Sequence, residues 1–260
     1  MIHFTQPEEE RLFNERHSQL LELLPTLNDT LDNVFKHTVM ADRAGLTVFM
    51  LGRRCANDFS EILLLGSNGY GFAALQILRS MFEKLVDARY LNKHQKEVEE
   101  FWDYHLILLV KLGYQDIAHK FDAEWEKKVA KFKTAGKKRD RTQPRWTKLT
   151  LVDEAKKVGL EDHLHGAYYL PNAFIHNSSA ELLFALEPDT NGRFTPLDFN
   201  NPKERRMADV AVHQGLLFLI FILQLEVEHY GWEGSALEVQ QCLDRFGPYL
   251  QSLNDRSKLK

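Results

Sequence analysis

The spacing of apolar residues is the feature that most restricts the fold of this chain. Across most of its 260 residues, apolar side chains recur at intervals of three and four, which is the repeat of one face of an α-helix. Helix-interrupting residues are few, with 14 glycines and 8 prolines. No stretch alternates apolar and polar residues for long enough to build a sheet. The sequence therefore predicts an all-α fold, a single-domain bundle of many helices.

The expected helices occupy most of the chain. Pro25 is expected to end the first of them, residues 187–202 to form a loop, and the tail 253–260 to fray. The domain spans residues 1–260, with its core between about 27 and 230. The expected helices lie near residues 5–24, 27–41, 43–65, 70–92, 95–112, 115–134, 150–158, 161–170, 172–185, 203–230 and 235–252.

Composition and the ends of the chain predict a cytoplasmic protein. Hydrophobic residues at 44% and charged residues at 27% exclude a largely disordered chain. Two cysteines, Cys55 and Cys242, are too few for a disulfide scaffold. The first residues do not form a signal peptide, and the longest apolar run, Leu216 to Leu223, is well short of the roughly 20 residues that span a bilayer. No membrane association is expected. The apolar helix near 203–230 is either core or the surface of a homodimer.

Positive charge is concentrated in one segment, residues 127–148, although the whole chain has a net charge of −4. This segment holds ten Lys or Arg and one acid, so its net charge is +9. It is either a contact for RNA or another polyanion, or a solvated connector between helices. The residues expected to contact nucleic acid are Lys133, Lys137, Lys138, Arg139, Arg141 and Arg145.

The helix near 70–92 is apolar almost all round, which is typical of a helix at the centre of a fold. Arg79 and Glu83 lie one helical turn apart on one of its apolar faces, so each needs a partner. One interpretation is a polar pocket with an anion-binding arginine. The other is a structural salt bridge that fixes the register of the helix.

A second polar cluster lies in residues 168–180, YYLPNAFIHNSSA. If the helix continues past Pro171, one stripe contains Tyr168, Asn172, His176 and Ser179. Alternatively, Pro171 begins a new helix, and His176 lies in its second turn. Neighbouring hydroxyl and amide groups can fix the tautomer of a histidine for acid–base chemistry, or they can simply satisfy a histidine of the core.

These segments carry a resemblance to a family of uncharacterised bacterial helical proteins, a domain of unknown function. The shared pattern is R-x-x-x-E in an apolar helix, then F-x-x-Y, then Y-x-x-x-(S/N)-x-x-x-H. It resembles this chain over roughly residues 40 to 230, and it implies a helical fold without an assigned activity. The matching residues are Arg79, Glu83, Tyr90, Phe101, Tyr104, Tyr168 or Tyr169, Asn172 and His176.

The chain also resembles, more distantly, the HEPN superfamily of helical bundles from prokaryotic defence and toxin systems. Many of its members are metal-independent RNases with an arginine followed four to six residues later by a histidine. Upstream of His176, the corresponding positions hold Tyr169, Leu170 and Pro171, so this chain departs from that signature.

Two functions follow from these interpretations, and whether the protein is an enzyme stays open. The first is a HEPN-like defence or stress protein that binds RNA or cleaves it without metal, with His176, Arg79, Glu83 and Tyr104 as its catalytic residues. In the second, a non-catalytic ligand-binding or interaction module, this cluster is structural. The ligand contacts expected are Tyr168, Asn172 and Ser179.

No cofactor and no metal are expected. The sequence contains neither a P-loop nor a dinucleotide-binding glycine fingerprint. A carboxylate three residues before a histidine is found about as often as chance predicts, and a di-iron bundle needs further facing carboxylates. The three pairs are Asp116/His119, Asp162/His165 and Glu226/His229.

Overall fold

A computed structural model describes residues 6–36, 42–114, 125–134, 141–142, 145–175, 186–188, 194–196, 201–230 and 233–258. Nearly all of its regular structure is helical, which confirms the all-α bundle. The α-helices are α1 (Pro7–Arg16), α2 (Ser18–Phe35), α3 (Arg43–Ser67), α4 (Gly71–Lys93), α5 (Val98–Lys111), α7 (Trp125–Lys131), α8 (Leu151–Lys157), α9 (Leu170–Ile175), α11 (Pro202–Tyr230) and α12 (Glu233–Lys258). Two 3₁₀ turns, η1 (Gln95–Glu97) and η2 (Glu161–His163), and a π-helical turn, η3 (His165–Tyr169), complete the helical set.

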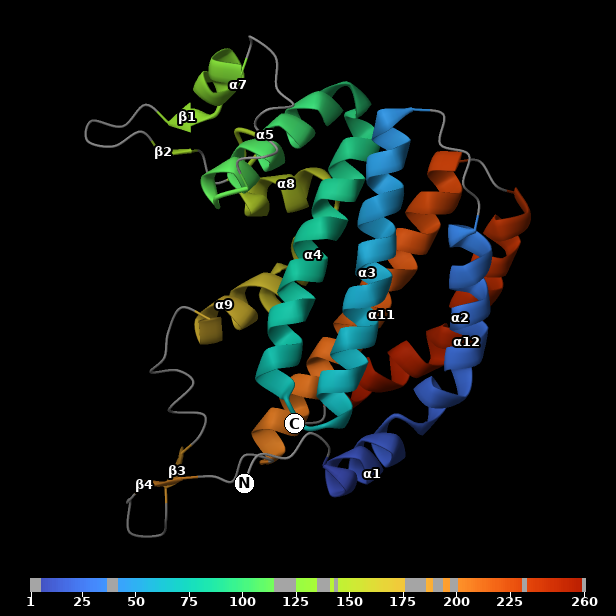
Figure 1. The fold of residues 1–260 in the computed structure, drawn as a ribbon. Helices are drawn as coiled ribbons and strands as arrows, with labels where there is room; N and C mark the ends of the chain where they lie inside the picture. Colours follow the sequence, from blue (N-terminus) through green and yellow to red (C-terminus); the bar gives the residue numbers. More distant parts are fainter. Residues whose placement is uncertain are drawn as a thin grey trace.

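Three long helices, α3, α4 and α11, pack side by side and form the core (Figure 1). Helix α4 lies between its two long neighbours and the flanking helices, so apolar residues on several of its faces are buried. Phe82 of α4, for example, packs against Phe218 of α11 with ring centroids 5.4 Å apart. The central, buried position predicted for the helix near 70–92 is confirmed.

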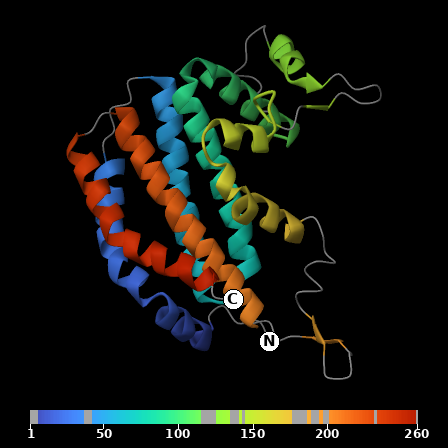
Figure 2. The same ribbon diagram turned by 180° about the vertical axis from the view of Figure 1, so that it is seen from behind.

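The remaining helices cover opposite sides of this core. Helices α2 and α12 pack against each other and against α11 on one side. On the other side lie α5, α7, α8, η3 and α9 with the β1–β2 ladder, which together we call the α5–α9 flank (Figure 2). Helix α4 contacts α8, η3 and α9 directly, so its residues on this side face the flank.

The first two helices meet at a different residue from the one predicted. The first helix, α1, ends before His17, and α2 continues through Pro25, the residue predicted to end the first helix. The His17 ring is buried, with Nε2 2.8 Å from Asp209 Oδ1 and Nδ1 2.9 Å from the Tyr249 hydroxyl. These tertiary contacts, together with the packing of α2 on α12, outweigh the local preference of proline.

Two short antiparallel ladders and one helix end also differ from prediction. Strands β1 (Lys133–Thr134) and β2 (Arg141–Thr142) pair where a helix was expected to reach 134. Strands β3 (Leu186–Pro188) and β4 (Phe194–Pro196) pair at and within the expected loop of 187–202. Helix α12 continues to Lys258 in place of a frayed tail. Strands of two or three residues are too short to show the alternation of apolar and polar residues from which a strand is predicted.

The apolar run of α11 belongs to the core. An 18-residue window of this helix has a mean hydropathy of 1.9, enough by length and composition to cross a membrane, but 67% of it is buried inside the protein. Core helices of soluble proteins pass the same test, so this window is weak evidence for a membrane span. Of the two predicted roles for the apolar run, core or dimer surface, the structure supports core.

The start of α4 touches the backbone of α11, and this contact requires glycine at position 71. A Cβ added to Gly71 would collide with the carbonyl oxygen of Glu204 and lie 2.7 Å from the amide nitrogen of Ala208. The Glu204 carboxylate also accepts a hydrogen bond from the Phe72 amide at 3.1 Å, as suits the N-terminus of a helix.

Gly71→Ala is therefore expected to lower the free energy of unfolding by about 1–3 kcal/mol, because backbone cannot move aside as a side chain can. Urea denaturation would measure the loss. Gly166→Ala is the control, since a Cβ there meets its nearest atom at 3.8 Å. Equal stability of the two variants would contradict the close approach of α4 and α11.

Candidate functional site

A stripe of charged residues runs along the side of α4 that faces the α5–α9 flank. Arg79, Glu83 and Asp87 follow one another at intervals of four residues, so they lie on one face of the helix. Glu83 lies close enough to Arg145 to raise the pKa of that arginine. The predicted site residues of α4 therefore belong to a longer polar row, which extends to Asp87 and to residues of the flank.

Arg79 is half-buried and only partly satisfied by the protein. Its Nε donates to Glu83 Oε1 at 3.1 Å, and its guanidinium carbon lies 5.4 Å from the centre of the Tyr168 ring. The side chains of Arg79 and Glu83 are 23% and 35% exposed. Within the described part of the chain, the two terminal amino groups of the Arg79 guanidinium have no hydrogen-bond partner. These groups can bind an anion that arrives from solvent.

The predicted stripe of Tyr168 and Asn172 lies on one continuous helical stretch. The π-helical turn η3 leads into α9 without a break at Pro171, and the Leu170 amide donates to the His165 carbonyl. The helix therefore continues past Pro171, the first of the two predicted alternatives. Asn172 Oδ1 is buried and has no hydrogen-bond partner among the described residues. His176 and Ser179 lie outside the described residues, and α9 ends at Ile175, directly before His176.

Arg145 lies at the centre of a buried charge cluster that sequence reasoning missed. Its guanidinium pairs with Asp87 of α4 and, at 2.5 Å, with Glu154 of α8. Asp87 also accepts from the Trp146 indole nitrogen at 2.8 Å, and Glu154 accepts from the Thr147 hydroxyl. Arg145 is 13% exposed and Glu154 fully buried, so this cluster joins α4, α8 and the segment between α7 and α8.

The protonation of this cluster follows from its burial. Burial opposes the charge on Arg145, but Asp87 and Glu154 outweigh it and raise the arginine's pKa. Burial raises the pKa of Glu154 to about 7, although Arg145 and the Thr147 hydroxyl act against the rise. One guanidinium thus serves two carboxylates. Arg145, one of the residues predicted to contact nucleic acid, is thus enclosed by these partners.

Tyr104 of α5 lies near this buried cluster. Its side chain is buried, and its ring packs edge-on against Phe132 at 5.5 Å. Burial raises the pKa of Tyr104; Arg145 opposes this effect and Asp87 adds to it. Tyr104 is therefore protonated at neutral pH and faces the Arg145 cluster. Among the described residues, no hydrogen bond or ring contact joins Tyr104 to Arg79.

The basic segment is partly neutralised by acids of α5. Lys128 of α7 lies 3.1 Å from Asp103, and Lys131 lies 2.5 Å from Glu100. Lys148 is exposed. In the β1–β2 ladder Lys133 pairs with Thr142 and Arg141 pairs with Thr134. The side chains of Lys133 and Arg141, and the whole of Lys137, Lys138 and Arg139, lie outside the described part of the structure. The described parts of the segment, α7, β1 and β2, belong to the α5–α9 flank (Figures 1 and 2). The same flank includes η3, which contains Tyr168, the residue that Arg79 contacts.

The described residues contain no group of three or more His, Cys, Asp and Glu side chains that could hold a metal ion. Of the carboxylate–histidine pairs noted in the sequence, Asp116 and His119 lie outside the described residues. Glu226 is buried and has no hydrogen-bond partner in the described part of the chain, and His229 Nδ1 contacts Asn92 Oδ1 at 2.6 Å. Cys55 and Cys242 are both buried and unpaired.

Comparison with known proteins places these residues in a family context. A family model described as "Family of unknown function (DUF5677)" matches residues 46–194, more than half of the chain, so the chain belongs to this family. The matched segment includes the polar row of α4, the Arg145 cluster and α9. No curated protein and no solved structure matches the chain.

Proposed function

We propose that this DUF5677 protein binds RNA, or a polyanion with the same phosphate backbone, along the α5–α9 flank. The main support for the proposal is the unused hydrogen-bonding capacity of Arg79. Its two terminal amino groups face no protein acceptor among the described residues. Tyr168 fixes the guanidinium from one side, which favours a single orientation for phosphate binding. The basic segment 127–148, whose described parts α7, β1 and β2 lie on the same flank, supplies long-range attraction for a polymer of negative charge.

Energetics argue against the alternative in which Arg79 and Glu83 merely lock the bundle. An ion pair one turn apart on a helix, with one partner about a third exposed, contributes roughly 0.3–0.5 kcal/mol. The stacking of Arg79 on Tyr168 adds about 0.5–1 kcal/mol. The cluster built around Arg145 is the better candidate for a structural lock, since its charges are far more buried.

Arg79→Met is therefore expected to lower the free energy of unfolding by only about 1 kcal/mol, while it weakens RNA binding about tenfold. Fluorescence anisotropy with a labelled single-stranded RNA oligonucleotide measures the binding. The slope of log affinity against log salt is expected to become shallower by about 0.7, the loss of one phosphate contact to a single strand.

Arg53→Met is the matched control, because Arg53 of α3 also stacks on an aromatic ring, that of Phe49 at 5.9 Å, and Phe49 packs against Phe35 of α2. Equal RNA affinity of the wild type and both variants would overturn the role of Arg79. Absence of RNA binding by the wild-type protein would overturn the proposed function itself.

RNA cleavage is a second candidate, and the position of α9 favours it. Tyr168 contacts Arg79, and the same helical stretch leads directly to His176. In this proposal the ribose 2′ hydroxyl loses its proton as its oxygen attacks phosphorus. The bond from phosphorus to the 5′ oxygen breaks, the 5′ oxygen takes up a proton, and a 2′,3′-cyclic phosphate remains. His176 serves as general acid or base, and Arg79 stabilises the charge on phosphorus. The link to the HEPN superfamily has no support in the comparisons and belongs to this proposal alone.

Cleavage that persists in EDTA and is lost in His176→Ala would support this candidate. RNA that remains intact with the wild-type protein, under conditions where it binds, would exclude it and leave the binding function standing. A cytoplasmic location and assembly into a homodimer stay predictions from the sequence; size-exclusion chromatography with light scattering tests the second.

A further inference from the structure

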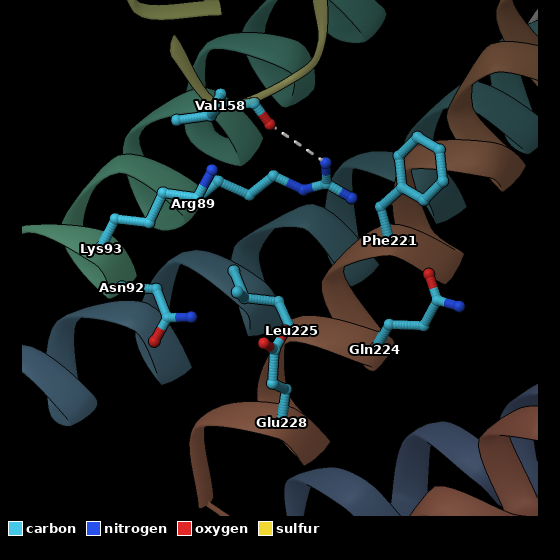
Figure 3. A pocket seen from close by; sticks show the side chains of 8 residues that line it. All are labelled: Arg89, Asn92, Lys93, Val158, Phe221, Gln224, Leu225 and Glu228. Carbon is cyan, nitrogen blue, oxygen red and sulfur yellow. Dashed lines mark hydrogen bonds between the residues drawn. The ribbon is translucent and has the colours of Figure 1, made fainter.

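A cavity of about 400 Å³ lies between the C-terminal halves of α4 and α11 and the end of α8. Figure 3 shows the Arg89 side chain extending across it toward Phe221, with Glu228 on the opposite side. The lining residues are Arg89, Asn92, Lys93, Val158, Phe221, Gln224, Leu225 and Glu228. This volume falls in the range of small-molecule sites in proteins, about 300–1,000 Å³.

Arg89 is half-buried in this cavity without a carboxylate partner among the described residues. Its Nη1 donates to the Val158 carbonyl oxygen at 3.4 Å, a long hydrogen bond, and its guanidinium lies 4.6 Å from the centre of the Phe221 ring. These two contacts hold the group in place and leave its other N–H donors unused.

Comparison with other arginines shows what Arg89 lacks. Arg145 and Arg205 contact carboxylates directly, and their pKa values are raised. Burial lowers the pKa of Arg89, and the more distant Glu228 only partly offsets this effect. The protein thus holds a cation in a partly desolvated place, and none of its described residues supplies an anion in contact with it, an arrangement that a bound anion would stabilise.

The other lining groups limit the class of ligand. Lys93 lies beside Arg89 at the end of α4 and adds a second positive charge. Phe221, Leu225 and Val158 give the cavity an apolar wall, against which a ring or short chain can pack. Gln224 and Glu228 are exposed at its rim.

We infer that this cavity is a binding site for a small organic anion, whose carboxylate or phosphate group pairs with Arg89 and whose apolar part packs on Phe221. The site lies on α4 and α11, separate from Arg79 and the contacts proposed for RNA. It therefore extends the proposed function and does not depend on it.

Isothermal titration calorimetry with benzoate and with phenyl phosphate tests this site, and uncharged benzamide serves as the ligand control. We expect saturable binding of at least one anion with a dissociation constant of about 1 mM or below, the range of a fragment-sized ligand. The stronger of the two probes identifies the anionic group that the site prefers. Arg89→Met is expected to weaken this binding at least tenfold, whereas Arg53→Met is expected to leave it unchanged.

A second measurement on the wild-type protein avoids dependence on the folding of a variant. The Nε–H signal of Arg89 in a proton–nitrogen NMR spectrum is expected to shift during titration with the stronger probe, while the Arg53 signal stays in place. Three results would overturn the inference: no binding of either anion, binding of benzamide as tight as that of benzoate, or an unchanged Arg89 signal at saturation.

Discussion

Arg145→Met is expected to lower the free energy of unfolding by about 3–5 kcal/mol, the range observed when one partner is removed from a buried ion pair. The loss is large because two carboxylates, Asp87 and Glu154, remain buried without their common cation. Methionine keeps much of the arginine side chain's volume, so the change reports mainly on charge. Urea denaturation at pH 7 measures it.

Two further variants distinguish the loss of the buried ion pairs from the loss of a positive charge in general. Lys148→Met removes a positive charge from an exposed position in the same segment, and we expect a change below about 0.5 kcal/mol. The triple variant Asp87→Asn, Glu154→Gln, Arg145→Met removes all three charges and is expected to regain a large part of the lost stability. Arg145→Met with nearly wild-type stability would contradict the cluster as the structural lock of the flank.

Glu226→Gln is expected to raise stability at alkaline pH by up to about 5 kcal/mol, at about 1.36 kcal/mol for each pKa unit. Glu226 lies on the α11 face that meets Gly52 of α3, it is fully buried, and neither of its carboxyl oxygens has a hydrogen-bond partner among the described residues. Burial raises its pKa from the ordinary 4.5 to about 8.

The direction of the pH dependence follows from these two values. In the unfolded chain Glu226 loses its proton near pH 4.5, whereas the folded protein keeps it to about pH 8. Between pH 4.5 and about 8 the folded state binds one proton more than the unfolded state. The free energy of unfolding therefore decreases as pH rises through this interval and levels off above it. Glu226→Gln removes this contribution.

The measurement is urea denaturation of the wild type and Glu226→Gln from pH 5 to 9. Glu10→Gln is the control, because Glu10 is exposed on α1. A difference between wild type and Glu226→Gln that stays constant with pH would show that Glu226 does not carry the raised pKa.

Local patterns predicted the centre of the fold and one pair of the site. The apolar circumference of the helix near 70–92 sufficed to place it in the core, because such a helix has no face suited to water. The four-residue spacing of Arg79 and Glu83 sufficed to pair them. Both depend on neighbours within one helix.

The pairing of Arg145 with Asp87 could not be predicted from neighbours within one helix, since Asp87 is 58 residues away along the chain. In the sequence Arg145 looks like any other member of a basic run. The sequence did contain a signal at Asp87, which continues the Arg79–Glu83 row in a largely apolar helix and therefore needed a cation. Arg89, a further charge in the same helix, could have been noticed in the same way.

The most direct test of the account is the NMR signal of the Arg79 Nε–H group during titration with single-stranded RNA, assigned by its loss in Arg79→Met. We expect this signal to shift in step with RNA binding, while the Arg53 signal stays unchanged. RNA binding that leaves the Arg79 signal in place would contradict the central claim that this arginine on α4 contacts the phosphate backbone.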